Sequence, residues 1–139
     1  MYRRIVVGLD GSDGARRALD AAIALARVCK SELFLVSIVE LPKYPGAIDE
    51  IEDERRTAEE FYREMQRQAV ERVTSAGLAV HADVRVGHPA QSLPAYAGEV
   101  KADLLALGHS GHSGIWGRVL GTTADKVVDL APCSVLVVR

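Results

Sequence analysis

The sequence predicts an α/β domain, a three-layer sandwich in which a five-stranded parallel sheet carries helices on both faces. Segments with strand-like and helix-like periodicity alternate along the whole chain, which is the pattern of repeated βα units. The apolar residues are dominated by 19 Ala, 17 Val and 14 Leu, with few aromatics, which suits a buried parallel sheet under small-residue helices. The 139 residues form one expected domain, 1–139, without a linker.

The first half of the chain is expected to contain two strands and two helices. Residues 5–9 form a short apolar run that ends in Asp10-Gly11-Ser12, a turn and helix-start signal. A helix is expected over residues 13–30, where apolar residues recur at helical spacing (Ala15, Ala18, Leu19, Ala22, Leu25, Ala26 and Cys29). Residues 33–39 form the second expected strand. A charged helix over residues 48–76 follows, and its mixed charges indicate a solvated helix face.

Glycine and proline residues mark the boundaries in the second half. Gly77 ends the long charged helix, and Pro132 ends the last helix. Between and after these marks, periodicity predicts a strand over 78–86, a helix from 87 to about 98, a strand over 103–107, a helix over 122–131 and a strand over 134–138.

Right-handed crossovers restrict such a chain to a few topologies, and strand order 3-2-1-4-5 is the one we expect. In that order the first and fourth strands are neighbours whose following connections leave in opposite directions. A crevice then opens at their carboxyl ends, where open α/β sheets bind ligands. Two glycine turns, Gly8-Leu9-Asp10-Gly11 and Gly108-His109-Ser110-Gly111, are expected to lie there.

Charge and composition exclude several classes of protein. Seventeen basic residues against nineteen acidic ones leave a net charge of −2, so a purely electrostatic nucleic-acid binder is excluded. The apolar runs are far too short for a membrane span, and the first residues lack the features of a signal peptide. We therefore expect a soluble, cytoplasmic protein. Cys29 and Cys133 belong to no CxxC pair and are expected to be two buried, unpaired thiols.

The strongest functional signal is the stretch from Gly108 to Gly121, which holds five glycines in fourteen positions. Glycine allows close backbone approach to a ligand, and such a loop can aim several N–H groups at an anion. The stretch ends at Thr122, whose hydroxyl can cap the next helix with Asp125 as its capping-box partner. A helix start adds unpaired N–H groups, so the segment predicts a phosphate site.

Two familiar phosphate motifs do not match, because no lysine follows Gly121 and no GxGxxG follows the first strand. The spacing Gly-x2-Gly-x9-Gly-Thr, from Gly108 to Thr122, is instead the nucleotide-binding motif of the universal stress protein family. The sequence resembles that family over essentially its full length. The supporting segments are Ile5-Val6-Val7-Gly8-Leu9-Asp10-Gly11-Ser12, Gly87-His88-Pro89-Ala90 and Ala131-Pro132-Cys133-Ser134-Val135-Leu136-Val137-Val138.

The resemblance implies a flavodoxin-like domain of the ATP-binding branch that forms homodimers. Carried over by position, the nucleotide-binding residues would be Asp10, Ile38, Gly108, Gly111, His112, Gly121, Thr122 and Thr123. Asp10 and the main chain of Ile38 would meet the adenosine end, and the glycines and threonines would hold the ribose and phosphates. His112 departs from the family, because many members carry Arg or Lys there and histidine has no permanent charge.

Some of these residues also allow a structural role instead of nucleotide binding. Asp10 could cap the first helix or shape its turn, although Ser12 could cap equally well. No acidic or cysteine partner stands at ligand spacing from His109 and His112, so no protein metal site is expected. A divalent cation, Mg²⁺ or Mn²⁺, would be held chiefly through the phosphates.

The family's dimers pair the last strand across a two-fold axis, which would bury the edge over residues 135–138 here.

Three functions are compatible with these patterns. The first is a regulatory ATP-binding protein that responds to stress and acts through a protein partner. The second is a slow ATPase, and the third is a nucleotide-free dimeric interaction module. The intact glycine motif argues against the third, and no catalytic residue can be named for the second, since phosphoryl transfer needs a group that positions the nucleophile. We expect binding rather than catalysis.

Overall fold

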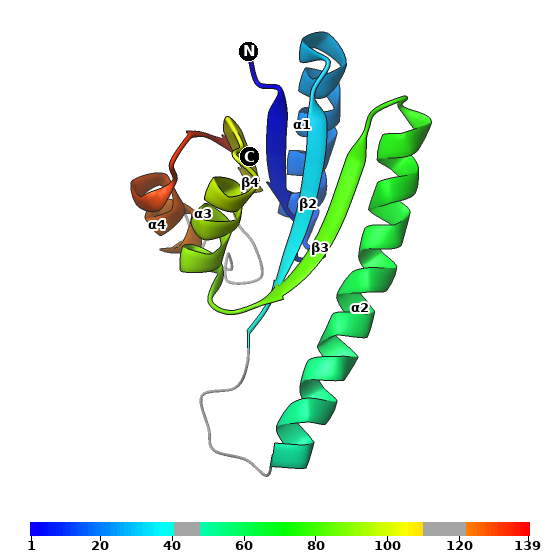
Figure 1. The fold of residues 1–139 in the computed structure, drawn as a ribbon, viewed down its shortest axis with the longest axis vertical. Coiled ribbons are helices and arrows are strands. Elements are labelled where there is room, and N and C mark those ends of the chain that lie inside the picture. Colours follow the sequence, from blue (N-terminus) through cyan, green and yellow to red (C-terminus); the bar gives the residue numbers. More distant parts are fainter. Residues whose placement is uncertain (41–47, 110–121) are drawn as a thin grey trace.

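The computed structural model describes residues 1–40, 48–109 and 122–139. Its helices are α1 (Asp13–Cys29), α2 (Ile48–Ser75), α3 (Pro89–Glu99) and α4 (Thr122–Leu130). Its strands are β1 (Arg4–Gly8), β2 (Glu32–Val39), β3 (Val80–Val86), β4 (Leu104–Gly108) and β5 (Ser134–Val138). The strands form one parallel sheet in the order β3-β2-β1-β4-β5, which confirms the predicted topology (Figure 1).

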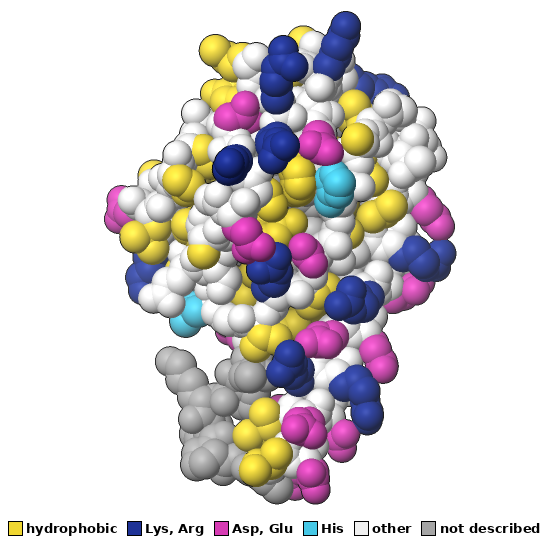
Figure 2. Space-filling model, viewed as in Figure 1, with side chains coloured by type: hydrophobic (Ala, Val, Ile, Leu, Met, Phe, Trp, Pro, Cys, Tyr) yellow, Lys and Arg dark blue, Asp and Glu magenta, His cyan; other side chains and the backbone are white. Residues whose placement is uncertain are grey.

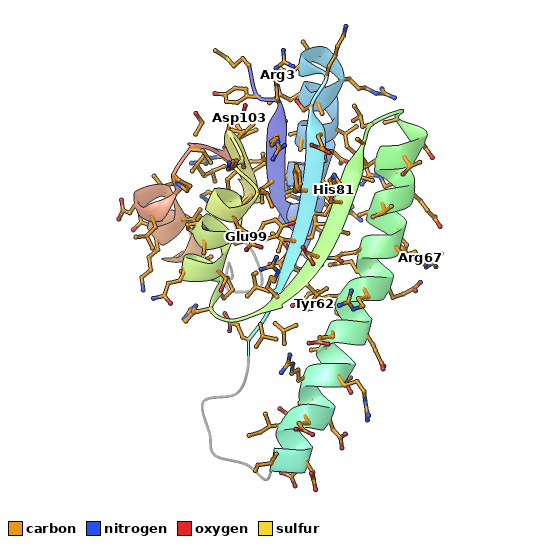
Figure 3. The ribbon with its side chains drawn as sticks, viewed as in Figure 1. Arg3, Tyr62, Arg67, His81, Glu99 and Asp103 are labelled. Carbon is orange, nitrogen blue, oxygen red and sulfur yellow. The ribbon has the colours of Figure 1, made fainter. Side chains whose placement is uncertain are left out.

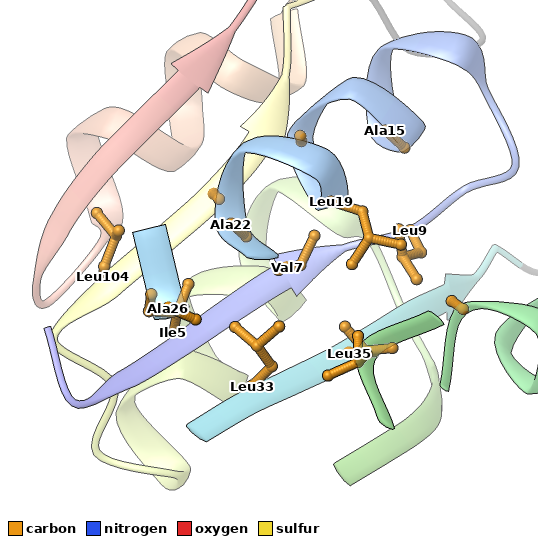
Figure 4. Close-up of a cluster of buried hydrophobic side chains, with 14 residues drawn as sticks. Ile5, Val7, Leu9, Ala15, Leu19, Ala22, Ala26, Leu33, Leu35 and Leu104 are labelled. Carbon is orange, nitrogen blue, oxygen red and sulfur yellow. The ribbon is translucent and has the colours of Figure 1, made fainter. Parts of the chain in front are cut away.

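Helices cover both faces of the sheet because side chains of each strand alternate between two apolar layers. Ile5 and Val7 of β1 point into a core formed with α1 and α2, shown in Figure 4. Val6, between them, points into a second core formed with α3 and α4. Both layers are lined by Ala, Val and Leu, as the composition predicts, and alanines on α1 such as Ala22 are fully buried against the strands.

Helix α1 is closed by polar groups at its amino end. The Ser12 hydroxyl accepts a hydrogen bond from the Ala15 amide at 3.1 Å, so Ser12 is the N-cap. The Asp10 carboxylate accepts from the Ser12 amide at 2.9 Å and shapes the turn before the helix. Asp10 therefore shapes the turn, and Ser12 rather than Asp10 caps the helix.

Helix α2 is 28 residues long and runs past the end of the sheet (Figure 1). Its sheet side buries Gln66, Ala69 and Val73. Its outer side carries neighbouring acidic and basic side chains, visible in Figure 2, with ion pairs such as Arg67–Glu71 at 3.1 Å. The expected solvated helix face is therefore confirmed.

Both cysteines are free, but neither is fully buried, which corrects the expectation of two buried thiols. Cys29 is the last residue of α1, directly before the left-handed C-cap Lys30, where the helix ends. Cys133 precedes the edge strand β5, which pairs only with β4 among the described strands. Partial burial still raises the pKa of the Cys133 thiol, with a smaller contribution from the negative charge of Asp103.

Candidate functional site

A cavity of about 380 Å³ opens at the carboxyl ends of β1, β2 and β4, where the strand order predicts a crevice. Its walls come from the ends of these strands and from all four helices or the turns before them. The lining residues are Gly8, Leu9, Asp10, Ser12, Ala15, Val36, Ile38, Val39, Glu40, Ala58, Tyr62, Pro89, Leu93, Leu107, Gly108, His109, Thr123 and Ala124.

The structure brings four of the predicted site residues together in this cavity. Asp10, Ile38, Gly108 and Thr123 all line it, although they lie on separate segments of the chain. Gly111, His112 and Gly121 lie outside the described residues. Thr122 begins α4 as expected, but its side chain is not described, so its capping role stays a prediction.

The turn that carries Asp10 lies close to α2. Gly11, the next residue, has φ +84°, a left-handed conformation that favours glycine. A β-carbon added there would lie 3.3 Å from the Met65 Sδ and 3.7 Å from the Phe61 ring. The turn is therefore constrained by its own hydrogen bond, and α2 limits the space for a side chain at residue 11.

Gly108 is required by close packing. A β-carbon there would lie 2.5 Å from the Gly14 carbonyl carbon and 2.9 Å from the Ala15 amide nitrogen. Both are backbone atoms of α1, so they cannot move aside as a side chain could. Its φ is not in the left-handed region, so space is the requirement. This contact brings the end of β4 directly beside the first turn of α1.

Ile38 presents its main chain to the cavity at a point where the sheet is open. The register of β1 and β2 ends at the pair Gly8–Val36, followed by a hydrogen bond from the Leu9 amide to the Val36 carbonyl at 2.9 Å. Ile38 lies two residues beyond Val36, so its peptide groups point to the same side, past the end of β1. The whole residue is only 8% exposed, and its side chain packs in the α3–α4 core.

Several lining residues were not predicted, above all Tyr62 and Ala58 from α2 and Glu40 after β2. A signal for Tyr62 was present, because it lies one helical turn before the buried Gln66 and on the same face of α2. Burial raises the pKa of the Tyr62 phenol, and the negative charges of Asp10 and then Glu40 raise it further. The phenol is therefore uncharged at neutral pH.

The charge in the cavity is uneven. Asp10 and Glu40 are acidic, and no lysine or arginine is among the described residues that line it. A favourable position for an anion at this edge is the start of α4 at Thr122, because the first N–H groups of a helix have no partner within the helix.

The described part of the chain contains no group of three His, Cys, Asp or Glu side chains that could hold a metal ion. In the same residues, no helix combines the length and apolar character that crossing a membrane requires.

Comparison with known proteins identifies the family. Universal stress protein Rv1636 of Mycobacterium tuberculosis is 38% identical over 144 residues, which cover 99% of this chain and 97% of that protein. The structure of universal stress protein UspA from Lactobacillus plantarum matches with a TM-score of 0.92 at 25% identity, covering 99% of this chain and 98% of that one. A universal stress protein in complex with cAMP matches with a TM-score of 0.75 at 33% identity, covering 99% and 97%. The model of the universal stress protein family matches residues 1–139, and the chain belongs to that family.

Proposed function

We propose that this protein binds an adenine nucleotide in the cavity at the ends of β1, β2 and β4, with ATP as the preferred ligand. The observation that carries the proposal is the convergence of Asp10, Ile38, Gly108 and Thr123 on one cavity. They are the residues that the family resemblance assigns to the nucleotide and that the structure describes in full. The relative that was crystallised with cAMP, 33% identical to this chain, supports an adenine ligand.

The proposed arrangement places the adenosine end near β1 and β2 and the phosphates near β4 and α4. Asp10 and the main-chain groups of Ile38 offer hydrogen bonds to the ribose and the base. Thr123 lines the cavity in the first turn of α4, whose N–H groups favour an anion. A divalent cation would be held through the phosphates, because no three-ligand cluster exists among the described residues.

This arrangement favours binding over catalysis. The described carboxylates of the cavity, Asp10 and Glu40, follow β1 and β2, whereas the phosphates are proposed to lie beyond β4. Phosphoryl transfer needs a group that orients the attacking water at the terminal phosphate. We therefore infer a binding protein rather than an enzyme. We propose that it is a cytoplasmic regulatory protein whose contacts with a protein partner depend on its nucleotide.

A homodimer is part of the proposal. Strand β5 forms one edge of the sheet, and its residues Val135, Leu136, Val137 and Val138 are only partly buried. An apolar edge strand is a template for pairing with another chain unless it is covered. Pairing of two β5 strands across a two-fold axis would cover this edge.

The test is calorimetric titration with ATP, ADP, AMP, cAMP and adenosine. Asp10→Asn should weaken every adenosine-containing ligand by roughly fivefold or more, because a charged acceptor is lost at the nucleoside end. The control is Asp13→Asn, which removes the same charge from an exposed residue outside the cavity. Absence of binding by all five ligands, together with no nucleotide released from the purified protein on denaturation, would overturn the proposal.

A further inference from the structure

Helix α2 contributes a wall to the cavity that the glycine motif does not involve. Tyr62 and Ala58 line the cavity from this helix, and Figure 3 shows Tyr62 at the end of the sheet where β2 and β3 finish. One turn later, the Gln66 amide nitrogen lies 3.0 Å from the Ser37 hydroxyl and 2.6 Å from the Asp83 carbonyl oxygen. These buried hydrogen bonds hold this part of α2 against β2 and β3 and thereby fix the position of Tyr62.

The wall is both apolar and acidic. Tyr62 presents a half-buried ring with an uncharged hydroxyl, and the carboxylates of Asp10 and Glu40 act on it electrostatically. Glu40 is at the mouth, because its side chain is 61% exposed, and His88 lies 3.9 Å from it. The histidine that lines the cavity, His109, follows β4, on the opposite side of β1 from β2.

Such a wall has a definite preference among chemical groups. Carboxylates accept hydrogen bonds and repel anions, whereas a neutral phenol can donate a hydrogen bond and cover an apolar ring face. A ribose diol or an exocyclic amine satisfies these groups. A phosphate on the ribose 2′-oxygen does not, because it would meet two negative charges without a described lysine or arginine in the wall.

We propose that Tyr62 and Glu40 are specificity-determining residues, which together with Asp10 admit a ribose with a free 2′-hydroxyl and exclude a nucleotide that carries a 2′-phosphate. The inference rests on the proposed adenine-nucleotide function and deepens it. The same wall would set the orientation of the nucleotide in the cavity, because the acidic residues near β2 repel the 5′-phosphates that the start of α4 attracts.

The experiment compares AMP with adenosine 2′,5′-bisphosphate by calorimetric titration at low and high salt. The wild type should bind AMP about tenfold more tightly at low salt, with a smaller ratio at high salt, because the discrimination is electrostatic. Glu40→Gln preserves the shape of the side chain and should lower this ratio at least about threefold. Glu60→Gln, an exposed charge-matched control on α2 outside the cavity, should leave the ratio unchanged.

Tyr62→Phe tests the hydroxyl separately and should weaken AMP by about threefold to tenfold while the melting temperature stays near that of the wild type. A wild-type ratio near one, or an identical ratio in Glu40→Gln, would overturn the role of Glu40. Unchanged AMP affinity in Tyr62→Phe would overturn the role of Tyr62. Failure of the wild type to bind any adenine nucleotide would overturn the proposed function and this inference with it.

Discussion

Gly108→Ala should destabilise the domain strongly, whereas the same change at Gly8 should be tolerated. Both glycines end neighbouring strands and line the same cavity. A β-carbon at Gly8 would lie 3.4 Å from a terminal methyl of Leu93, which can change its side-chain conformation. At Gly108 it would lie 2.5 Å from the carbonyl carbon of Gly14, and relief would require moving α1 away from β4.

The expected loss of folding stability in each variant follows from this difference in neighbouring atoms. Overpacking that forces backbone to move costs about 1–3 kcal/mol, and we place Gly108→Ala at the upper end because every close atom is main chain. A contact with a flexible side chain should cost less than about 1 kcal/mol at Gly8. For a domain of this size, the Gly108 variant should melt roughly 6–12 °C below the wild type.

Urea denaturation followed by far-UV circular dichroism measures both variants under the same conditions. The unfolding free energy of each variant should fall with urea concentration at the same slope as that of the wild type. The midpoint urea concentrations then report stability directly. If the two variants unfold at the same urea concentration, the close approach of β4 and α1 does not constrain residue 108. Ligand affinity is a second readout, because displacement of α1 would also disturb the turn that carries Asp10.

Two further predictions concern the edges of the sheet. Val137→Lys should convert a dimer into monomers, because it places a charge on the β5 edge that is proposed to pair, and light scattering that still reports a dimer would reject that interface. At the other edge, the Arg85 guanidinium donates hydrogen bonds of 2.9 and 3.0 Å to Glu99 and lowers the pKa of that carboxyl below its ordinary 4.5. This group therefore stabilises the fold above pH 4.5, and that stabilisation is lost as pH falls through the lower folded-state pKa. Glu99→Gln should be less stable than the wild type at pH 7 and should approach it in acid, whereas a difference independent of pH would contradict this role.

The fold could be predicted from the sequence because its causes are local and repetitive. Periodicity marks each strand and helix, and the handedness of βα crossovers then leaves the order 3-2-1-4-5. Element ends were less predictable. The third strand was expected from residue 78, but β3 begins at Val80, and the Ala79 carbonyl accepts a bond from Leu33 just before it. Leu78 is apolar because it packs against the core, which periodicity cannot distinguish from strand pairing.

The candidate site was only partly predictable, for a physical reason. Residues in the turns after β1 and β4 can be found from glycine spacing, because the topology brings these turns to one edge of the sheet. The reason for glycine at 108 depends on the distance to Gly14, which no spacing rule contains. In the chain, α1 and β2 lie between Asp10 and Tyr62, and only the packing of α2 brings these two residues to one cavity.

These two origins of the site suggest a division of roles within it. The turns after β1 and β4 are fixed by backbone requirements, the positive φ of Gly11 and the close approach at Gly108, so their geometry tolerates few substitutions. The wall from α2 is made by side chains on a helix whose position is fixed one turn further along, by Gln66. Tyr62 can therefore change without disturbing the sheet or the turns. On this reasoning the strand ends supply the frame for an adenine nucleotide, and α2 is where selectivity among nucleotides can vary.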